Sequence, residues 1–194
     1  MNYPARFFGH LHTVNSHRRK VFAHCCRAGI PWQGLRHDLS KYSPTEFCNG
    51  VRYFQGNRSP NDAEREDIGY SSAWMHHKGR NRHHFEYWVD YHPVTRKQEP
   101  VKMPVKYVAE MFCDRVAAGK IYMKKNYTND APLQYFLKAK GRRIIHPETS
   151  DLLESWLTLL AEQGEDAAFA AIRARLRDEK KNRKKRRISQ NHDA

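Results

Sequence analysis

Apolar residues recur at helical spacing along much of the chain. Residues 105–118 place them on one side of a predicted amphipathic helix. The apolar positions of this helix are Val105, Val108, Ala109, Phe112 and Val116. The stretches 150–164 and 165–181 also have a helical pattern, which predicts a pair of helices that meet at Gly164.

Two further helices are expected nearer the N-terminus. Residues 10–28 contain neither Pro nor Gly and are followed by Gly29, a residue that commonly ends helices. Pro31 suits the first turn of a second helix, which we expect over residues 31–39. Three histidines recur at every seventh position and share one face of the first helix: His10, His17 and His24.

The remaining segments contain no strand pattern. Residues 43–70 are rich in Pro, Gly, Asn and Ser, which is typical of short helical turns and loops, and residues 93–104 form a Pro- and Lys-rich loop. Residues 72–92 are expected to form two helix ends, each with a pair of histidines, joined by a loop at the central Lys-Gly-Arg-Asn, residues 78–81. We therefore predict an all-α helical bundle in one domain, residues 1–179, followed by a flexible basic tail, residues 180–194.

The composition indicates the kind of partner and the compartment. The formal net charge is +14, which favours an anionic partner such as a phosphorylated small molecule, nucleic acid or an acidic surface. No run approaches the roughly 18 apolar residues of a membrane helix, and the first residues are too polar for a signal peptide. We expect a cytoplasmic protein without a membrane partner, in which the four cysteines are thiols.

The adjacent pair His37 and Asp38 suggests a metal centre. Neighbouring side chains on a helix point about 100° apart, so the two do not normally serve one packed surface. Imidazole nitrogen and carboxylate oxygen both bind divalent transition metals, so a shared ion would explain the pair. Taken alone, the pair could equally be a surface dipeptide near a helix end. Asp114, close to the apolar side of its predicted helix, adds a third candidate ligand.

The order of these residues resembles that of a known superfamily. A histidine in the first helix, the pair at the end of the second and Asp114 on a later helix follow the order in the HD-domain superfamily of metal-dependent phosphohydrolases. The string LRHDLSK resembles that superfamily's His-Asp motif, and MFCDRVAA resembles its helix with the last Asp. The blocks HDLSKYSPTEF and AWMHHKGRNRHHFEYW more closely resemble an uncharacterised bacterial family within or beside this superfamily.

The resemblance implies an HD-like bundle that holds one or two divalent transition-metal ions, of Mn, Fe, Co, Ni or Zn. The implied ligands of a first ion are His17, His37, Asp38 and Asp114, with His10 or His12 as alternatives to His17. Extra histidines between the His-Asp pair and the last Asp imply a second ion, with Asp38 as the bridge. One member of each pair is expected to face this ion, and the candidates are His76, His77, His83 and His84. His24 is expected to be a packed core residue instead.

Charged residues near these ligands have implied or possible roles in catalysis. Lys41 follows the His-Asp pair, where the superfamily also has a lysine, and it could neutralise a phosphoryl oxygen. Glu110 lies one turn before Asp114 and could orient a ligand or a water, or pair with a surface base. The candidates for substrate binding are Lys78, Arg80 and Arg82, and the alternative for the two arginines is solvated loop charge.

The implied function is a metal-dependent phosphohydrolase that acts on a nucleotide or another small phosphorylated compound with metal-activated water. A di-iron HD-type oxygenase remains an alternative, because first-row metals overlap in ligand preference. A nucleic-acid-binding module with structural histidines is a third possibility, favoured by the charge and by KKNRKKRR at residues 180–187. The basic tail could also attach a phosphohydrolase to nucleic acid.

Overall fold

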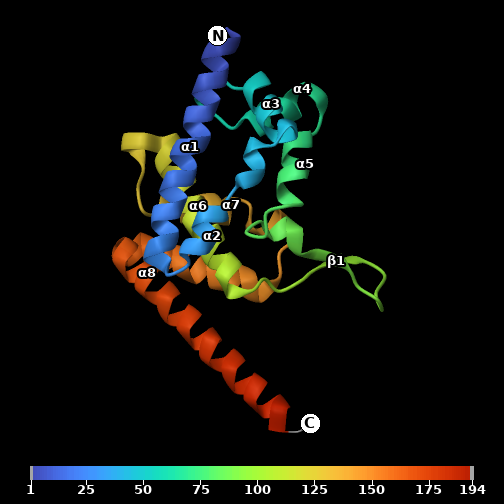
Figure 1. The fold of residues 1–194 in the computed structure, drawn as a ribbon, viewed down its shortest axis with the longest axis vertical. Coiled ribbons are helices and arrows are strands. Elements are labelled where there is room, and N and C mark those ends of the chain that lie inside the picture. Colours follow the sequence, from blue (N-terminus) through green and yellow to red (C-terminus); the bar gives the residue numbers. More distant parts are fainter. Residues whose placement is uncertain (1, 193–194) are drawn as a thin grey trace.

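The computed structural model describes residues 2–192, and in this range eight α-helices and one small β-hairpin form the fold (Figure 1). The helices are α1 Tyr3–Ala28, α2 Pro31–Arg36, α3 Pro44–Arg52, α4 Pro60–Ile68, α5 Ser72–Lys78, α6 Val105–Met123, α7 Ala131–Lys138 and α8 Pro147–His192. The antiparallel strands are β1 Val89–Tyr91 and β2 Gln98–Pro100. The all-α class is confirmed, whereas the hairpin replaces part of the predicted loop.

Helix α1 begins earlier than predicted and ends where predicted. The Asn2 side chain accepts a hydrogen bond from the backbone N–H of Ala5 at 3.1 Å, which satisfies one donor of the first turn. At the other end Gly29 has φ 80°, a left-handed conformation that costs glycine little. The chain then turns back, so that α2 packs against α1.

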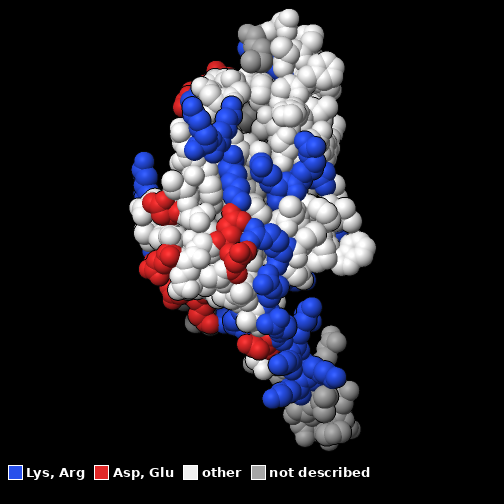
Figure 2. Space-filling view, turned by 90° about the vertical axis from the view of Figure 1, so that its left-hand side faces the viewer, with Lys and Arg blue, Asp and Glu red and all other residues white. Residues whose placement is uncertain are grey.

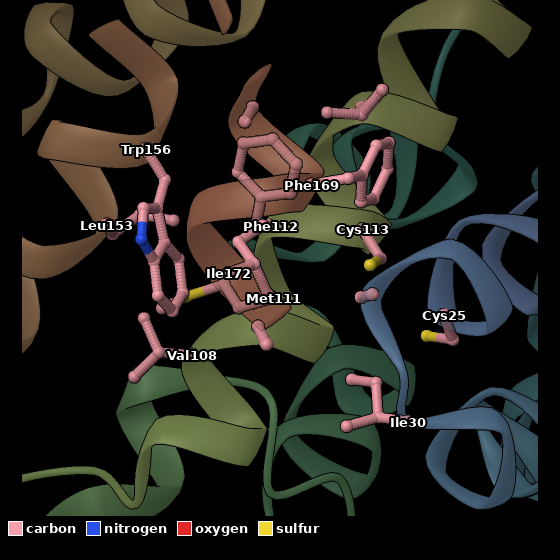
Figure 3. Close-up of a cluster of buried hydrophobic side chains, with 14 of the residues drawn as sticks. Cys25, Ile30, Val108, Met111, Phe112, Cys113, Leu153, Trp156, Phe169 and Ile172 are labelled. Atoms are coloured by element: carbon pink, nitrogen blue, oxygen red, sulfur yellow. The ribbon is translucent and has the colours of Figure 1, made fainter. Parts of the chain in front are cut away.

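Helix α6 lies at the centre of the bundle and packs against α1 and α8. The five apolar positions predicted for this helix are confirmed, because all five side chains are buried. Its Phe112 lies among Trp156 and Phe169 of α8, as Figure 3 shows. Met111, Cys113 and Glu110 are buried as well, so the helix is covered on more than one side. One side of α6 packs against the apolar core, and another side places polar residues such as Glu110 in the interior.

Helix α8 contains the predicted break at Gly164, where φ is 82° and ψ is −178°. Before the break Leu153, Leu157 and Leu160 are buried in the core, and after it Phe169 returns to the same core. The backbone then continues as a helix to His192. The described part of the predicted basic tail is helical and extends α8 away from the body of the protein (Figure 1), and its flexibility stays a prediction. Its last two residues lie outside the described range, and the boundary at residue 180 stays a prediction.

Short helices lie beside the N-terminal half of α1 (Figure 1). The region 43–70 contains α3 and α4, each nine residues long, and α5 follows with Ser71 as its N-cap. The second histidine pair was expected at a helix end, but it lies in a turn that leads to a 3₁₀ helix, Phe85–Trp88. None of the described helices is both long and apolar enough to cross a membrane.

Candidate metal centre

The His37-Asp38 pair lies just beyond α2 rather than on its last turn, which corrects the predicted span of 31–39. His37 has φ −54° and ψ 129°, and Asp38 has φ 53° and ψ 28°. A positive φ is uncommon for residues other than glycine and often occurs at functional sites. Leaving the helix frees the two side chains from their 100° separation, and His37 Nε2 lies 3.1 Å from Asp38 Oδ2.

The first cluster joins α1, the turn after α2 and α6. His17 Nε2 lies 3.0 Å from Asp114 Oδ1 and 3.5 Å from Asp38 Oδ2. His37 Nε2 lies 3.4 Å from His17 Nε2. One donor atom from each of these four residues lies within 4.8 Å of the others, so they could hold a metal ion. We call this group cluster 1: His17, His37, Asp38 and Asp114.

The other candidates for the first histidine lie elsewhere. His10 contacts the rings of Phe47 and Phe54, with ring centroids 5.2 Å and 6.0 Å away. His12 is exposed on another side of α1. His24 is buried and lies against Phe169, as expected for a packed core residue. Of the four histidines on α1, the structure brings only His17 to cluster 1.

A second cluster uses the other oxygen of Asp38. Asp38 Oδ1 lies 3.3 Å from His77 Nε2 and 3.4 Å from His83 Nε2. His84 completes a set of donor atoms that also lie within 4.8 Å of one another. We call this group cluster 2: Asp38, His77, His83 and His84. Asp38 therefore belongs to both clusters, with Oδ2 towards the first and Oδ1 towards the second.

Three polar atoms of cluster 2 are buried without a hydrogen-bond partner. They are Asp38 Oδ1, His83 Nε2 and His84 Nε2. Buried polar atoms are nearly always hydrogen-bonded, and leaving one unsatisfied costs roughly 1–3 kcal/mol. Three such atoms directed at one place fit a cation that accepts lone pairs from nitrogen and oxygen.

Two glutamates hold the opposite side of the histidine rings. Glu110 Oε1 lies 3.0 Å from His37 Nδ1 and 3.2 Å from His83 Nδ1. Glu46 accepts hydrogen bonds from His76 Nδ1 at 2.6 Å and His77 Nδ1 at 2.7 Å. A carboxylate that binds Nδ1–H leaves Nε2 as the lone-pair donor, which is the arrangement that orients metal-binding histidines. Glu110 fits this orienting role rather than contact with a substrate.

Glu46 is not among the residues predicted from the sequence. It lies three residues after Ser43, whose side chain caps α3, so its sequence position suggests a capping box and no more. Its carboxylate is buried, at 6% exposure, and reaches α5 because α3 packs against that helix. Only this packing reveals its relation to His77.

The two histidine pairs and the two arginines near them differ in their relation to the clusters. His76 is bound to Glu46 and is not in either cluster. Both members of the other pair, His83 and His84, belong to cluster 2, although only one was expected there. Arg82 donates to the Tyr107 hydroxyl at 3.3 Å, and the exposed Arg80 reaches the backbone of its own turn.

Lys41 and Lys78 differ in their relation to the clusters. Lys41 Nζ lies 2.6 Å from Asp38 Oδ2, and its side chain is 30% exposed. Lys78 is half-buried at the end of α5, and no contact places it at either cluster within the described residues. The substrate-binding roles of Lys78, Arg80 and Arg82 stay predictions.

The charges of the clusters compensate one another. Burial disfavours the carboxylate of Asp38, but His37, Lys41 and His77 outweigh it and hold the pKa of Asp38 well below its usual range. Burial likewise disfavours a charged His37, but Asp38 and hydrogen bonds with carboxylates raise the pKa of His37. Burial and the neighbouring histidines lower the pKa of His84, which favours the neutral, ligand form.

The fold and the two clusters define an all-helical protein with a candidate metal centre. The chain belongs to the family described as "Family of unknown function (DUF5662)", whose model matches residues 6–159. The matched range contains every residue of both clusters and both glutamates. No curated protein and no solved structure matches the chain.

Proposed function

We propose that this protein is a metal-dependent phosphohydrolase of the HD type that binds two divalent transition-metal ions. The observation that carries the proposal is the position of Asp38, whose two oxygens belong to two different sets of nitrogen and oxygen donors. The order of His17, His37-Asp38 and Asp114 along the chain, which resembles the HD superfamily, supports the same assignment.

The donor sets fit such ions. Cluster 1 would supply two imidazoles and two carboxylates, and cluster 2 would supply three imidazoles and the second oxygen of Asp38. Both are sets that first-row transition metals accept. Ions held there would lower the pKa of bound water and withdraw charge from a phosphoryl oxygen.

Two side chains at cluster 1 are partly exposed to solvent. The side chain of Asp114 is 19% exposed and that of Lys41 is 30% exposed, whereas those of His37 and Asp38 are almost fully buried. A phosphorylated substrate would approach past Asp114 and Lys41. The Lys41 ammonium would bind a phosphoryl oxygen and offset the charge that develops in hydrolysis. Burial of the other ligands keeps water from their donor atoms.

A second candidate, a di-iron oxygenase on the same fold, is favoured by one observation. Cluster 2 contains three histidines against one carboxylate oxygen. A nitrogen-rich set of this kind also suits iron, so the choice depends on the metal and its chemistry.

The test is metal analysis followed by an activity panel. The full chain is purified without oxygen and without chelators, and its metals are measured per chain. The metal-loaded protein is then assayed with nucleotides, phosphomonoesters and phosphodiesters. About two ions per chain with phosphate release supports the proposal. Two irons with oxygen consumption and no phosphate release supports the oxygenase. Less than one ion per chain, with no rise in melting temperature when metal is added, contradicts both.

Nucleic acid is the proposed partner of the basic end of α8. Lys and Arg side chains gather along the projecting part of the protein, as Figure 2 shows. Exposed basic residues in the described part of this segment are Arg175, Arg177, Lys180, Lys181, Arg183, Lys184 and Lys185. A helix with this charge would contact phosphates without reading sequence.

A further inference from the structure

A cavity of about 440 Å³ lies between α1, α2 and the 3₁₀ helix Leu39–Tyr42. Its volume is within the range of small-molecule sites, roughly 300–1,000 Å³. None of its lining residues belongs to cluster 1 or cluster 2. The lining residues are His12, Asn15, Arg18, Arg19, Phe22, Gly34, Leu35 and Tyr42.

The lining has the charge of an anion site. It includes two arginines and a histidine, and no carboxylate is among its residues. Arg19 is exposed, and its guanidinium donates to Ser16 Oγ at 3.4 Å. Because an arginine has five N–H donors, most of those of Arg19 face solvent or an incoming anion.

Arg18 forms the wall between the cavity and the His37-Asp38 turn. Its Nε donates to the carbonyl oxygen of His37 at 2.9 Å, and its Nη2 donates to that of Leu35 at 3.0 Å. Its Nη1 donates to the Tyr42 hydroxyl at 3.1 Å, which in turn donates to Asn15 Oδ1. These bonds use three of its five N–H groups and leave one on each terminal nitrogen.

The cavity also exposes apolar surface. Phe22 is 41% exposed and Leu35 is 52% exposed, and both line the cavity. Gly34 lets α2 approach α1 closely, because a Cβ at this position would lie 2.6 Å from Cys25 Cβ. The two helices therefore meet closely at Gly34, and the aromatic ring of Phe22 lines the cavity together with the two arginines.

We propose that this cavity binds a small organic anion with a ring, of the chemical class of aryl or nucleoside monophosphates. The phosphate is held by Arg19 and by the remaining N–H groups of Arg18, and the ring packs on Phe22 and Leu35. Arg18 also couples the cavity to His37, so that an anion here alters the metal affinity of cluster 1. This coupling rests on the proposed function, whereas the binding site itself does not.

The binding site is tested by calorimetric titration of the full chain with phenyl phosphate. Arg19→Gln should weaken binding about tenfold or more through loss of a charged hydrogen bond. Phe22→Ala should weaken the binding of phenyl phosphate but leave the binding of inorganic phosphate nearly unchanged. Arg36→Gln is the matched control, since Arg36 is exposed on α2 outside the cavity and carries the same charge. It should bind as the wild type does.

The outcomes separate this site from the metal centre. Metal content is measured for every variant and should equal that of the wild type. If Arg19→Gln and Phe22→Ala bind phenyl phosphate like the wild type, the probe binds elsewhere and the cavity proposal is wrong, while the proposed function stands. If the protein lacks metal yet shows the expected pattern of variants, the cavity site is supported and the proposed function fails.

The coupling has its own measurement. The Mn²⁺ affinity is measured with and without saturating phenyl phosphate, which gives one ratio of affinities. The phenyl phosphate affinity is measured with and without Mn²⁺, and its ratio should be the same. At a phenyl phosphate concentration that just saturates the wild type, Arg19→Gln should bring the ratio of Mn²⁺ affinities closer to one, because less of the variant's cavity is then occupied. A probe bound directly to the ions would show no such dependence on Arg19. A ratio of one in the wild type, or an unchanged ratio in Arg19→Gln, contradicts the coupling.

Discussion

At the scale of single residues, the two oxygens of Asp38 have different surroundings. Oδ2 lies near His17, His37 and Lys41, and Oδ1 lies buried near the histidines of cluster 2 without a hydrogen-bond partner. The sequence could predict Asp38 because a His-Asp pair is recognisable by residue type and order. It could not predict Glu46, whose relation to His77 depends on how α3 packs against α5.

Asp38→Asn should reduce metal content from about two ions per chain to one or none and lower phosphohydrolase activity at least a hundredfold. The amide keeps the size of the side chain but loses the charge and one lone-pair oxygen. Metal per chain and turnover are measured together. Asp90→Asn is the control, because Asp90 is exposed on β1. Normal metal content in the Asp38 variant would contradict its position between two ions.

Glu46→Gln should weaken the binding of one ion by about 10- to 100-fold while the other ion remains bound. The amide can still contact one histidine ring, but it no longer accepts from both His76 and His77 with a full charge. A metal titration that resolves two affinities measures the effect. The matched control is Glu66→Gln, a carboxylate that pairs with Arg58 at the surface. An equal loss of metal affinity in both variants would contradict the orienting role of Glu46.

At the scale of elements, the sequence predicts a helix or strand correctly where its pattern of apolar and helix-ending residues extends over many positions. Helix α1 and the break at Gly164 follow from residues that stop or permit a helix locally. The strands β1 and β2 have only three residues each, too few to show alternation. Both His83 and His84 join cluster 2 because they lie in a turn, where the helical separation of neighbours does not apply.

Helix α1 should contribute an acid-sensitive part of the stability through His24. Burial lowers the pKa of His24 to about 4, and the positive charges of Lys120 and Arg27 act in the same direction. The Cys113 carbonyl and Glu165 raise this pKa, but their effects are weaker than that of burial. The unfolded chain binds the proton near pH 6.5, so this stabilisation is complete above pH 6.5 and is lost as the pH falls to 4. The full effect is on the order of 3 kcal/mol.

The measurement is urea unfolding of the wild type and of His24→Gln at pH 7.5 and pH 4.5. From pH 7.5 to pH 4.5 the free energy of unfolding of the wild type should fall by about 2.5 kcal/mol more than that of the variant. His92→Gln, at an exposed histidine, should follow the wild type. Parallel loss in the wild type and in His24→Gln would show that His24 does not titrate in this way.

At the scale of the whole molecule, most residues of the two clusters are buried, whereas the basic end of α8 projects from the bundle (Figure 1). This separation suggests that contact with nucleic acid and hydrolysis are independent. Deleting residues 180–194 should flatten the dependence of single-stranded DNA affinity on salt concentration, since fewer phosphates are neutralised. Hydrolysis of a small substrate should stay unchanged. Loss of hydrolysis in the shortened protein would place the basic segment at the active site.

Helix α6 carries Phe112 into the apolar core and, two residues later, Asp114 into cluster 1. An ion bound by Asp114 would therefore brace the same helix against which α8 packs. Under the proposed function, a cell short of the metal would lose more than activity. The unbound chain would open more often, proteases would remove it faster, and its abundance would follow the metal supply.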